Sequence, residues 1–311
     1  MGTAGRAHPV KLGPTRTAPH TLAGIALLVV AVACFAILDT TTKAVSLSVP
    51  VLMALWFRYA FQAIATTVAV LPKRRWTLLR TAHPRFQCLR GVLLITSSAL
   101  AFFSLQHMPV GEFTAIVMVT PLVITLLASL TLDERVSVLR WVLVIGGFVG
   151  TLIILRPGSE RFNWGMLLPL GLVASNAWFQ ILTSRLARTE DPFTMHFYTG
   201  WVGTLLASLA LPFVWTSLDS WTLWAGLCLM GLMATVGHFV MILAYARAPV
   251  STLTPFLYAQ IGFAMLGGWL AFSHVPDQWS LLGIGMIAVC GAAGAWLAVR
   301  ESRVMIQPPE S

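Results

Sequence analysis

Charged residues are scarce in this chain. Only 10% of its 311 residues are Asp, Glu, Lys or Arg, against about 25% in ordinary soluble domains. Hydrophobic residues make up 57% of the chain, and the mean hydropathy is +0.81. Such a chain cannot cover a surface that faces water, and no apolar segment keeps the wide polar face of a soluble helix. The composition therefore excludes a soluble globular protein and predicts one that crosses a membrane several times.

Groups that carry out chemistry are also few. Of the eleven acidic residues, only Asp39 and Glu112 lie in or beside an apolar segment. No nucleotide-binding glycine loop, nucleophile motif or metal-binding histidine cluster occurs. The four cysteines lie in apolar segments without metal-ligand spacing, which favours a packing role. These absences argue against an enzyme, and we expect neither a metal nor a cofactor.

Long apolar stretches, in contrast, are abundant. A helix needs about 20 apolar residues to cross a bilayer, and the strict alternation of membrane barrel strands is absent. We therefore predict an all-α membrane protein with ten transmembrane helices. The predicted spans are residues 20–43, 51–71, 86–106, 110–131, 137–155, 163–187, 193–215, 221–246, 251–273 and 279–299.

The chain contains one pattern twice. Residues 97–158 are echoed by residues 236–291 at an offset of 140, which pairs Pro109 with Pro249 and Thr114 with Thr254. We predict two repeats, residues 20–158 and 159–300, between a disordered basic tail at 1–19 and a tail at 301–311. Because each repeat has an odd number of helices, the second copy enters the membrane from the opposite side, so the repeats are inverted.

Basic residues predict the orientation. With the N-terminus in the cytoplasm, sixteen Lys and Arg residues fall on the cytoplasmic side and two on the other side, as the positive-inside rule requires. Both termini are therefore expected in the cytoplasm of a bacterial inner membrane. The basic residues are scattered over short segments, which excludes a nucleic-acid surface and favours contact with membrane lipid.

Several motifs in the chain are typical of one family. They are Phe103-Ser104-Leu105 to Pro109, Glu112-Phe113-Thr114-Ala115, Thr120-Pro121-Leu122, Leu132-Asp133-Glu134-Arg135, Gly146-Gly147-Phe148-Val149-Gly150 and Leu155-Arg156-Pro157-Gly158. With these motifs the chain resembles the drug/metabolite transporter superfamily, in its EamA-type branch of ten-helix carriers. One departure is His274, where the second-half motif usually carries an acidic residue.

The resemblance implies a secondary transporter that works by alternating access on a small polar metabolite, as a monomer or homodimer. It points first to export of an amino-acid-like solute. The alternative is uptake of a vitamin or nucleoside-like cofactor, of the riboflavin or S-adenosylmethionine type. A membrane-embedded enzyme or a passive channel is less favoured.

Polar residues inside spans are costly unless they face protein or water, so each is a candidate for the transport pathway. In inverted-repeat carriers the substrate site lies near the midplane, between the repeats. The pathway candidates, with the aromatic residues expected beside a substrate, are Phe35, Asp39, Arg58, Asn176, Trp178, Gln180, His238, Tyr258 and Gln260.

Structural roles compete with these functional ones. Asp39 can pair with Lys43, one helical turn away. Together with Arg58 they can form an ion-pair cluster whose role is structural, to hold the first two predicted helices together. Asp39, Glu112 and His238 are candidates for proton coupling, although a carboxylate also suits the first turn of a helix. The amide side chains can equally serve as hydrogen bonds between helices. The helix kinks are predicted at Pro121 and Pro255.

Overall fold

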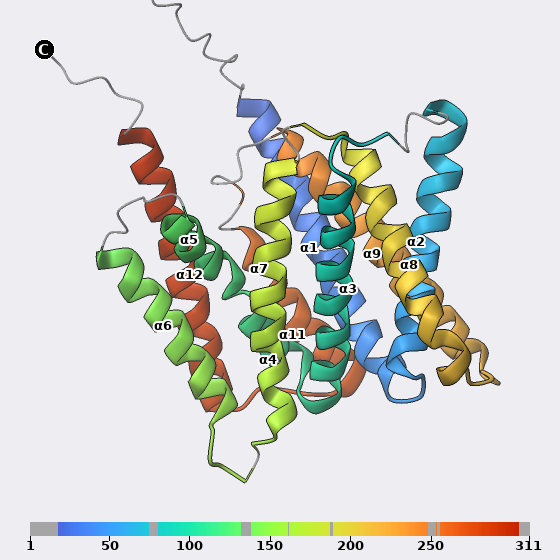
Figure 1. Ribbon diagram of the computed structural model, residues 1–311. Coiled ribbons are helices and arrows are strands. Elements are labelled where there is room, and N and C mark those ends of the chain that lie inside the picture. The colour runs from blue at the N-terminus through green and yellow to red at the C-terminus, as the bar shows by residue number, and fades with distance from the viewer. Residues whose placement is uncertain are drawn as a thin grey trace, which may run out of the picture.

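The computed structural model describes residues 18–74, 80–131, 138–160, 162–186, 189–247, 253 and 256–304. Within these residues the regular structure is entirely helical (Figure 1). The elements are α1 (Ala18–Ser46), α2 (Val51–Arg74), α3 (Pro84–His107), α4 (Val110–Val117), α5 (Thr120–Thr131), α6 (Val138–Leu155), η2 (Trp164–Leu167), α7 (Leu168–Leu186), α8 (Pro192–Val214), α9 (Trp221–Arg247), α11 (Ala259–Phe272) and α12 (Gln278–Val304).

The helices confirm the predicted membrane architecture. In the described part of the chain, seven helices are long and apolar enough to cross a bilayer. Three shorter apolar helices, at Val110–Ile124, Trp141–Leu155 and Ala259–Phe272, occupy the places of the fourth, fifth and ninth predicted spans. The ten-helix prediction is therefore confirmed.

The fourth span is not continuous. Helix α4 ends at Val117 and α5 begins at Thr120, directly before Pro121. Proline has no backbone N–H, so it cannot bond the carbonyl four residues earlier, which belongs to Val117. The hydroxyl of Thr120 donates to that carbonyl at 2.6 Å. The carbonyl that the proline leaves without a backbone donor is thus engaged by a side chain. Pro255, the other expected kink, lies outside the described residues.

Helices of the two halves run in opposite directions and pack reciprocally. Helix α1 begins at the end of the bundle where α12 finishes, whereas α7 begins at the opposite end (Figure 1). We call these the terminal end and the far end. Helix α1 packs along α9, and its counterpart α7 packs along α3. This reciprocity is what two inverted copies of a five-helix unit produce.

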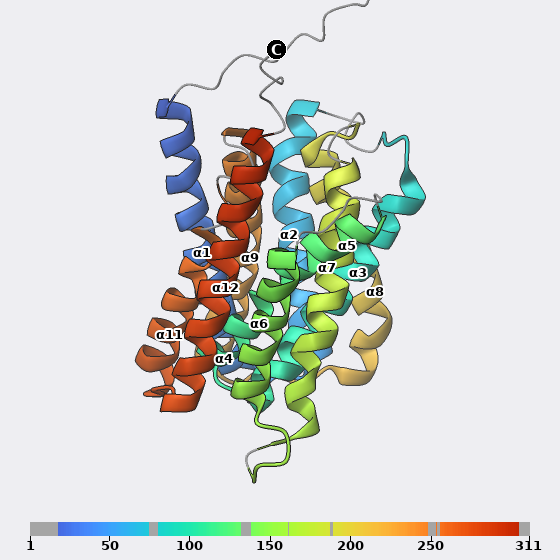
Figure 2. The same ribbon diagram turned by 90° about the vertical axis from the view of Figure 1, so that its left-hand side faces the viewer.

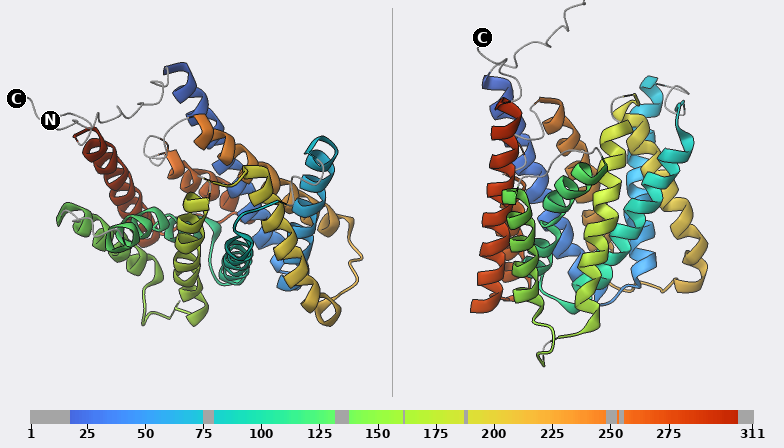
Figure 3. Two further views of the ribbon diagram at one scale, coloured as in Figure 1. Left: turned by 45° about the horizontal axis from the view of Figure 1, so that its top comes forward. Right: turned by 60° about the vertical axis from the view of Figure 1, so that its left-hand side comes forward.

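Two helix pairs form opposite edges of the bundle. The α6–α12 pair lies at one edge and the α2–α8 pair at the other, with α1, α3, α4, α7, α9 and α11 between them (Figures 1 and 3). In Figure 2 the α6–α12 edge faces the viewer. In the α6–α12 pair, a Cβ atom added at Gly283 would lie 2.6 Å from the carbonyl oxygen of Gly150. Glycine is therefore required at this crossing, because any side chain would separate the two backbones.

Candidate functional site

Asp39 lies at the interface between the two halves. Its Oδ2 accepts a hydrogen bond from Nε2 of Gln260, on α11, at 3.3 Å. Its charge also interacts electrostatically with Arg58, on α2. Helix α1 thus carries a carboxylate whose partners come from both halves, and any relative movement of the halves changes its surroundings.

Lys43 has other partners. Within the described residues no ion pair joins Lys43 to Asp39; the amine instead donates to the carbonyl oxygens of Leu105 at 2.7 Å and Met108 at 2.9 Å. These carbonyls lie at the C-terminal end of α3, where the helix dipole favours a cation. The amide of Gln106 also donates to the Ser46 carbonyl at 3.0 Å. Together these bonds tie α1 to α3 at the far end.

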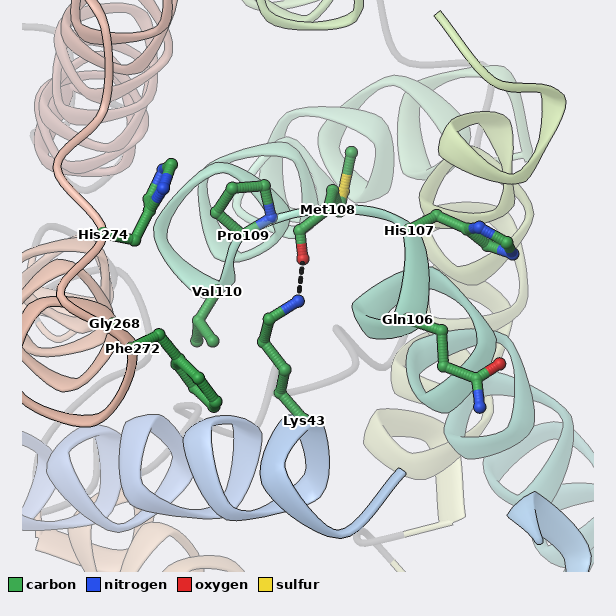
Figure 4. Close-up of a pocket in the computed structure, with 9 residues that line it drawn as sticks. All are labelled: Lys43, Gln106, His107, Met108, Pro109, Val110, Gly268, Phe272 and His274. Carbon is green, nitrogen blue, oxygen red and sulfur yellow. Dashed lines mark hydrogen bonds between the residues drawn. The ribbon is translucent and has the colours of Figure 1, made fainter. Parts of the chain in front are cut away.

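A pocket of about 310 Å³ opens beside Lys43 (Figure 4). Its wall is made by the end of α1, the connection between α3 and α4, and the end of α11, so both halves contribute. Figure 4 shows Lys43 reaching toward the Met108 carbonyl, with Pro109 and Val110 between it and His274. The lining residues are Lys43, Gln106, His107, Met108, Pro109, Val110, Gly268, Phe272 and His274.

Arg58 is buried within the span of α2, with 7% of its surface exposed. One guanidinium nitrogen donates to the Ser98 hydroxyl at 2.9 Å, and that hydroxyl also bonds to Tyr59 at 2.8 Å. The Nε atom is buried without a hydrogen-bond partner. Its guanidinium also lies 5.4 Å from the ring centre of Tyr59, and its charge interacts with Asp39. A buried charge whose hydrogen-bond partner is a neutral hydroxyl is costly.

A second buried arginine was missed by sequence reasoning. The orientation count treats Arg90 as a cytoplasmic basic residue, but it lies within α3 and is 5% exposed. It donates to Thr183 at 2.9 Å, to Gln87 at 2.8 Å and to the Met195 carbonyl at 3.2 Å. Its guanidinium also lies 5.3 Å from the ring centre of Phe179. Arg90 therefore joins α3, α7 and α8; its only signal in the sequence was a position inside a predicted span.

Phe35 and His238 form an aromatic contact between α1 and α9. Their ring centres are 4.9 Å apart in an edge-to-face arrangement. Nδ1 of His238 lies 2.7 Å from the Ala234 carbonyl oxygen, which fixes that nitrogen as a donor and leaves Nε2 directed elsewhere. These two candidates are thus brought together across the repeats.

The three candidate residues on α7 do not lie together. Asn176 and Gln180 are one turn apart and bond to each other at 3.3 Å. Trp178 keeps 50% of its surface exposed. It lies about 100° around the helix from Phe179, which packs against Arg90. The amides therefore form one polar unit, and Trp178 is not brought to it.

Tyr258 is a packing residue in this structure. It is 8% exposed, and its hydroxyl is buried without a hydrogen-bond partner. A Cβ atom added at Gly291 of α12 would lie 2.0 Å from that hydroxyl oxygen, so the ring rests directly on the glycine backbone. The close approach explains the glycine and gives the tyrosine a structural role.

Glu112 does not cap its helix with a hydrogen bond. Pro109 is the residue before α4, and the first turn has no side-chain capping bond. The carboxylate is instead buried near two basic groups. Oε1 lies 3.7 Å from Nε2 of His274, and the charge interacts electrostatically with Lys43.

Glu190 organises the loops at the terminal end. Its Oε1 accepts from the Thr81 hydroxyl at 2.8 Å, from the amides of Ala82 and His83 at 3.0 and 3.1 Å, and from the His83 ring at 3.1 Å. Burial by itself raises the pKa of this carboxyl, but these hydrogen bonds outweigh it and lower the pKa below its usual value. Glu190 thus ties the α7–α8 connection to the start of α3.

The far end has a comparable tie between α6 and α12. Arg156, just after α6, donates to Asp277 and to the Ser280 hydroxyl, and the Ser280 amide donates to Asp277 at 2.8 Å. These bonds hold the pKa of the Asp277 carboxyl well below its usual range. Among the described residues no group of three His, Cys, Asp or Glu side chains is placed to hold a metal ion.

Opposed helices with buried charges between the two halves are the architecture of a secondary carrier, and comparisons with known proteins agree. The EamA-like transporter family matches residues 22–156. A riboflavin transporter of Vibrio cholerae is 30% identical over 293 residues, which cover 91% of this chain and 96% of that protein. The chain therefore belongs to the EamA-like transporter family, in the drug/metabolite transporter superfamily.

Other relatives are also named as transporters. An S-adenosylmethionine uptake transporter of Rickettsia bellii is 28% identical, over 75% of this chain and 79% of its own length. A pseudopaline exporter of Pseudomonas aeruginosa is 25% identical, over 86% of this chain and 93% of its own length. A crystal structure with a TM-score of 0.63 and 18% identity covers 92% of this chain and shares its fold. The chain is thus a membrane transporter of a small molecule and not an enzyme.

Proposed function

We propose that this transporter carries a planar heteroaromatic metabolite of the riboflavin type into the cell. The observation that supports this most is the similarity to a riboflavin transporter along nearly the whole length of both chains. Sequence reasoning placed amino-acid export first and this uptake second. We place the uptake first, and the support for this is that a riboflavin transporter and an S-adenosylmethionine uptake transporter are among the relatives.

The candidate residues fit such a solute. Phe35 and His238 offer aromatic edges and faces between α1 and α9, and aromatic contacts of this kind contribute about 0.5–1.5 kcal/mol beyond area burial. The amides of Asn176 and Gln180, and Gln260 beside Asp39, provide donors and acceptors for ring nitrogens and carbonyls. In this proposal the aromatic pair contacts the ring of the solute, and the amides form hydrogen bonds with its nitrogens and carbonyls.

Export of an amino-acid-like solute is the second candidate. The similarity to a pseudopaline exporter favours the outward direction. The buried guanidinium of Arg58 favours a carboxylate, because arginine binds carboxylates through two parallel hydrogen bonds. In this alternative Asp39 takes the amino group of the solute.

For the orientation, we propose that the terminal end faces the cytoplasm. Five exposed arginines are attached to helix ends or loops there, namely Arg80, Arg85, Arg185, Arg247 and Arg300. The bonds of Lys43 to α3 then lie at the outer end, within the first repeat. We further propose that residues 20–158 and 159–300 are the two repeats that move against each other during alternating access.

Transport by purified protein in proteoliposomes tests the proposal. Radiolabelled riboflavin should enter at a rate that saturates, without ATP, and excess unlabelled riboflavin should compete. Phe35→Ala should raise KM about two- to tenfold, because it removes one aromatic contact of about 0.5–1.5 kcal/mol. Trp178→Ala is the matched control and should leave KM unchanged.

The outcomes separate the two candidate functions. If riboflavin does not enter but preloaded amino acids exchange across the membrane, the export hypothesis replaces the uptake hypothesis. If Trp178→Ala raises KM while Phe35→Ala does not, the assignment of the site is wrong, whichever solute is carried.

A further inference from the structure

His274 and Glu112 meet across the two halves at the far end. His274 follows α11, and Glu112 lies in the first turn of α4. Nε2 of His274 is 3.7 Å from Oε1 of Glu112, and this nitrogen is buried with no hydrogen-bond partner. The Glu112 side chain is 10% exposed, whereas the His274 side chain is 37% exposed. The ring therefore lies along the pocket while its unbonded nitrogen is directed to a buried carboxylate.

The other charged and titratable groups here have partners of their own. From α1, Lys43 approaches Glu112, but its amine is bonded to the two α3 carbonyls. Asp39, one turn earlier, accepts from Gln260. Asp277, just before α12, is bonded to Arg156, just after α6.

His107 is the remaining titratable group, at the end of α3. It lines the same pocket, but its ring lies on the far side of Met108 from His274 (Figure 4). Its ring also faces η2, because a Cβ atom added at Gly165 would lie 2.3 Å from His107 Cδ2. Among the described residues, His274 is thus the base near Glu112 whose facing nitrogen has no hydrogen-bond partner.

From this geometry we infer that the His274–Glu112 pair is a proton-binding site that holds the far end closed. A proton entering through the pocket adds to the lone pair of Nε2 and turns the neutral ring into an imidazolium. The imidazolium and the Glu112 carboxylate then form an ion pair between α4 and the α11–α12 connection. Loss of that proton to the pocket removes the positive charge and with it this link.

The consequence is a gate that responds to pH on the far side. Histidine is the side chain that ordinarily changes charge between pH 5 and 8. A proton that binds the closed state better than the open one shifts the population toward closure. An ion pair with this exposure changes the closed-to-open ratio by about two- to fivefold, as for partly exposed pairs. The inference rests on the proposed function in one respect, that the chain is a carrier whose two ends open in turn.

A distance measurement tests the gate without any substrate. Spin labels at Ser48 and Val275, both exposed at the far end, report the separation of the halves in a cysteine-free protein in nanodiscs. On lowering the pH from 8 to 5.5, the shorter distance should gain population by about two- to fivefold. His274→Gln and Glu112→Gln should each abolish this response, and His107→Gln, the matched control, should keep it.

A transport measurement complements the distance measurement. Entry of riboflavin from the far side should slow by a similar factor at pH 5.5 in the wild type and not in His274→Gln. Failure of riboflavin entry in every variant, with an intact distance response, would remove the proposed substrate and leave the proton site standing. A pH response that persists in His274→Gln, or that disappears in His107→Gln, would overturn the proton site.

Discussion

Replacing Arg90 by lysine should destabilise the protein although it keeps the charge. The guanidinium makes three hydrogen bonds, to Thr183, Gln87 and the Met195 carbonyl, in three directions. A lysine ammonium is a single point on a flexible stem and cannot reproduce this planar fork. We expect one or two of the three bonds to be lost, together with the stacking on Phe179.

The magnitude follows from the bonds. A hydrogen bond to a charged group contributes about 1.5–3 kcal/mol, so Arg90→Lys should cost about 2–4 kcal/mol. At about 2–4 °C per kcal/mol for chains somewhat shorter than this one, the detergent-solubilised variant should melt about 4–16 °C below the wild type.

The matched control lies on the same helix. Arg85 is exposed, so Arg85→Lys should change the stability by no more than about 0.5 kcal/mol. A melting temperature of Arg90→Lys equal to that of the wild type would refute the reasoning, because it would mean that the three bonds contribute nothing a lysine cannot supply.

Three further changes test other parts of the structure. Glu190→Gln should lose about 1–3 kcal/mol at pH 7; since the folded pKa is lowered, the difference from wild type in melting temperature should shrink as the pH falls below the unfolded pKa of about 4.3 and disappear below the folded pKa. Gly283→Ala should destabilise by about 1–3 kcal/mol because the methyl group meets the Gly150 carbonyl, whereas Gly285→Ala has open space and should not; equal melting temperatures would contradict this contact. Pro121→Ala supplies the missing N–H and should make α4 and α5 more continuous, which we expect to slow transport in a protein of normal stability; an unchanged initial rate would mean that the break is incidental.

Hydropathy alone predicted the helical frame. Spans such as α2 and α8 are long and apolar enough to cross a bilayer, so their positions follow from length and composition. The break at Met118–Val119 was only partly predictable. Pro121 indicates a bend, but it does not show which group donates a hydrogen bond to the Val117 carbonyl. The Thr120 hydroxyl is that donor, and no sequence pattern indicates this bond.

The contacts of the charged residues could not be predicted in the same way. The spacing of Asp39 and Lys43 favoured a pair, but Lys43 bonds to backbone carbonyls of α3. Every residue carries a carbonyl, so no sequence pattern marks these acceptors. Arg90 illustrates a second difficulty: a count of basic residues assigns a side of the membrane and cannot tell an exposed arginine from a buried one.

The bond between Lys43 and α3 has a consequence for how variation at the far end will be tolerated. Both acceptors are main-chain atoms, so substitutions of the Leu105 or Met108 side chains leave them in place as long as α3 ends where it does. The donor is a single side chain. In a saturation library selected for growth on a transported solute, position 43 should therefore be intolerant while its two partners accept many residues. This contact between α1 and α3 then depends genetically on the codon for residue 43 alone, and covariation between the contacting positions will not reveal it.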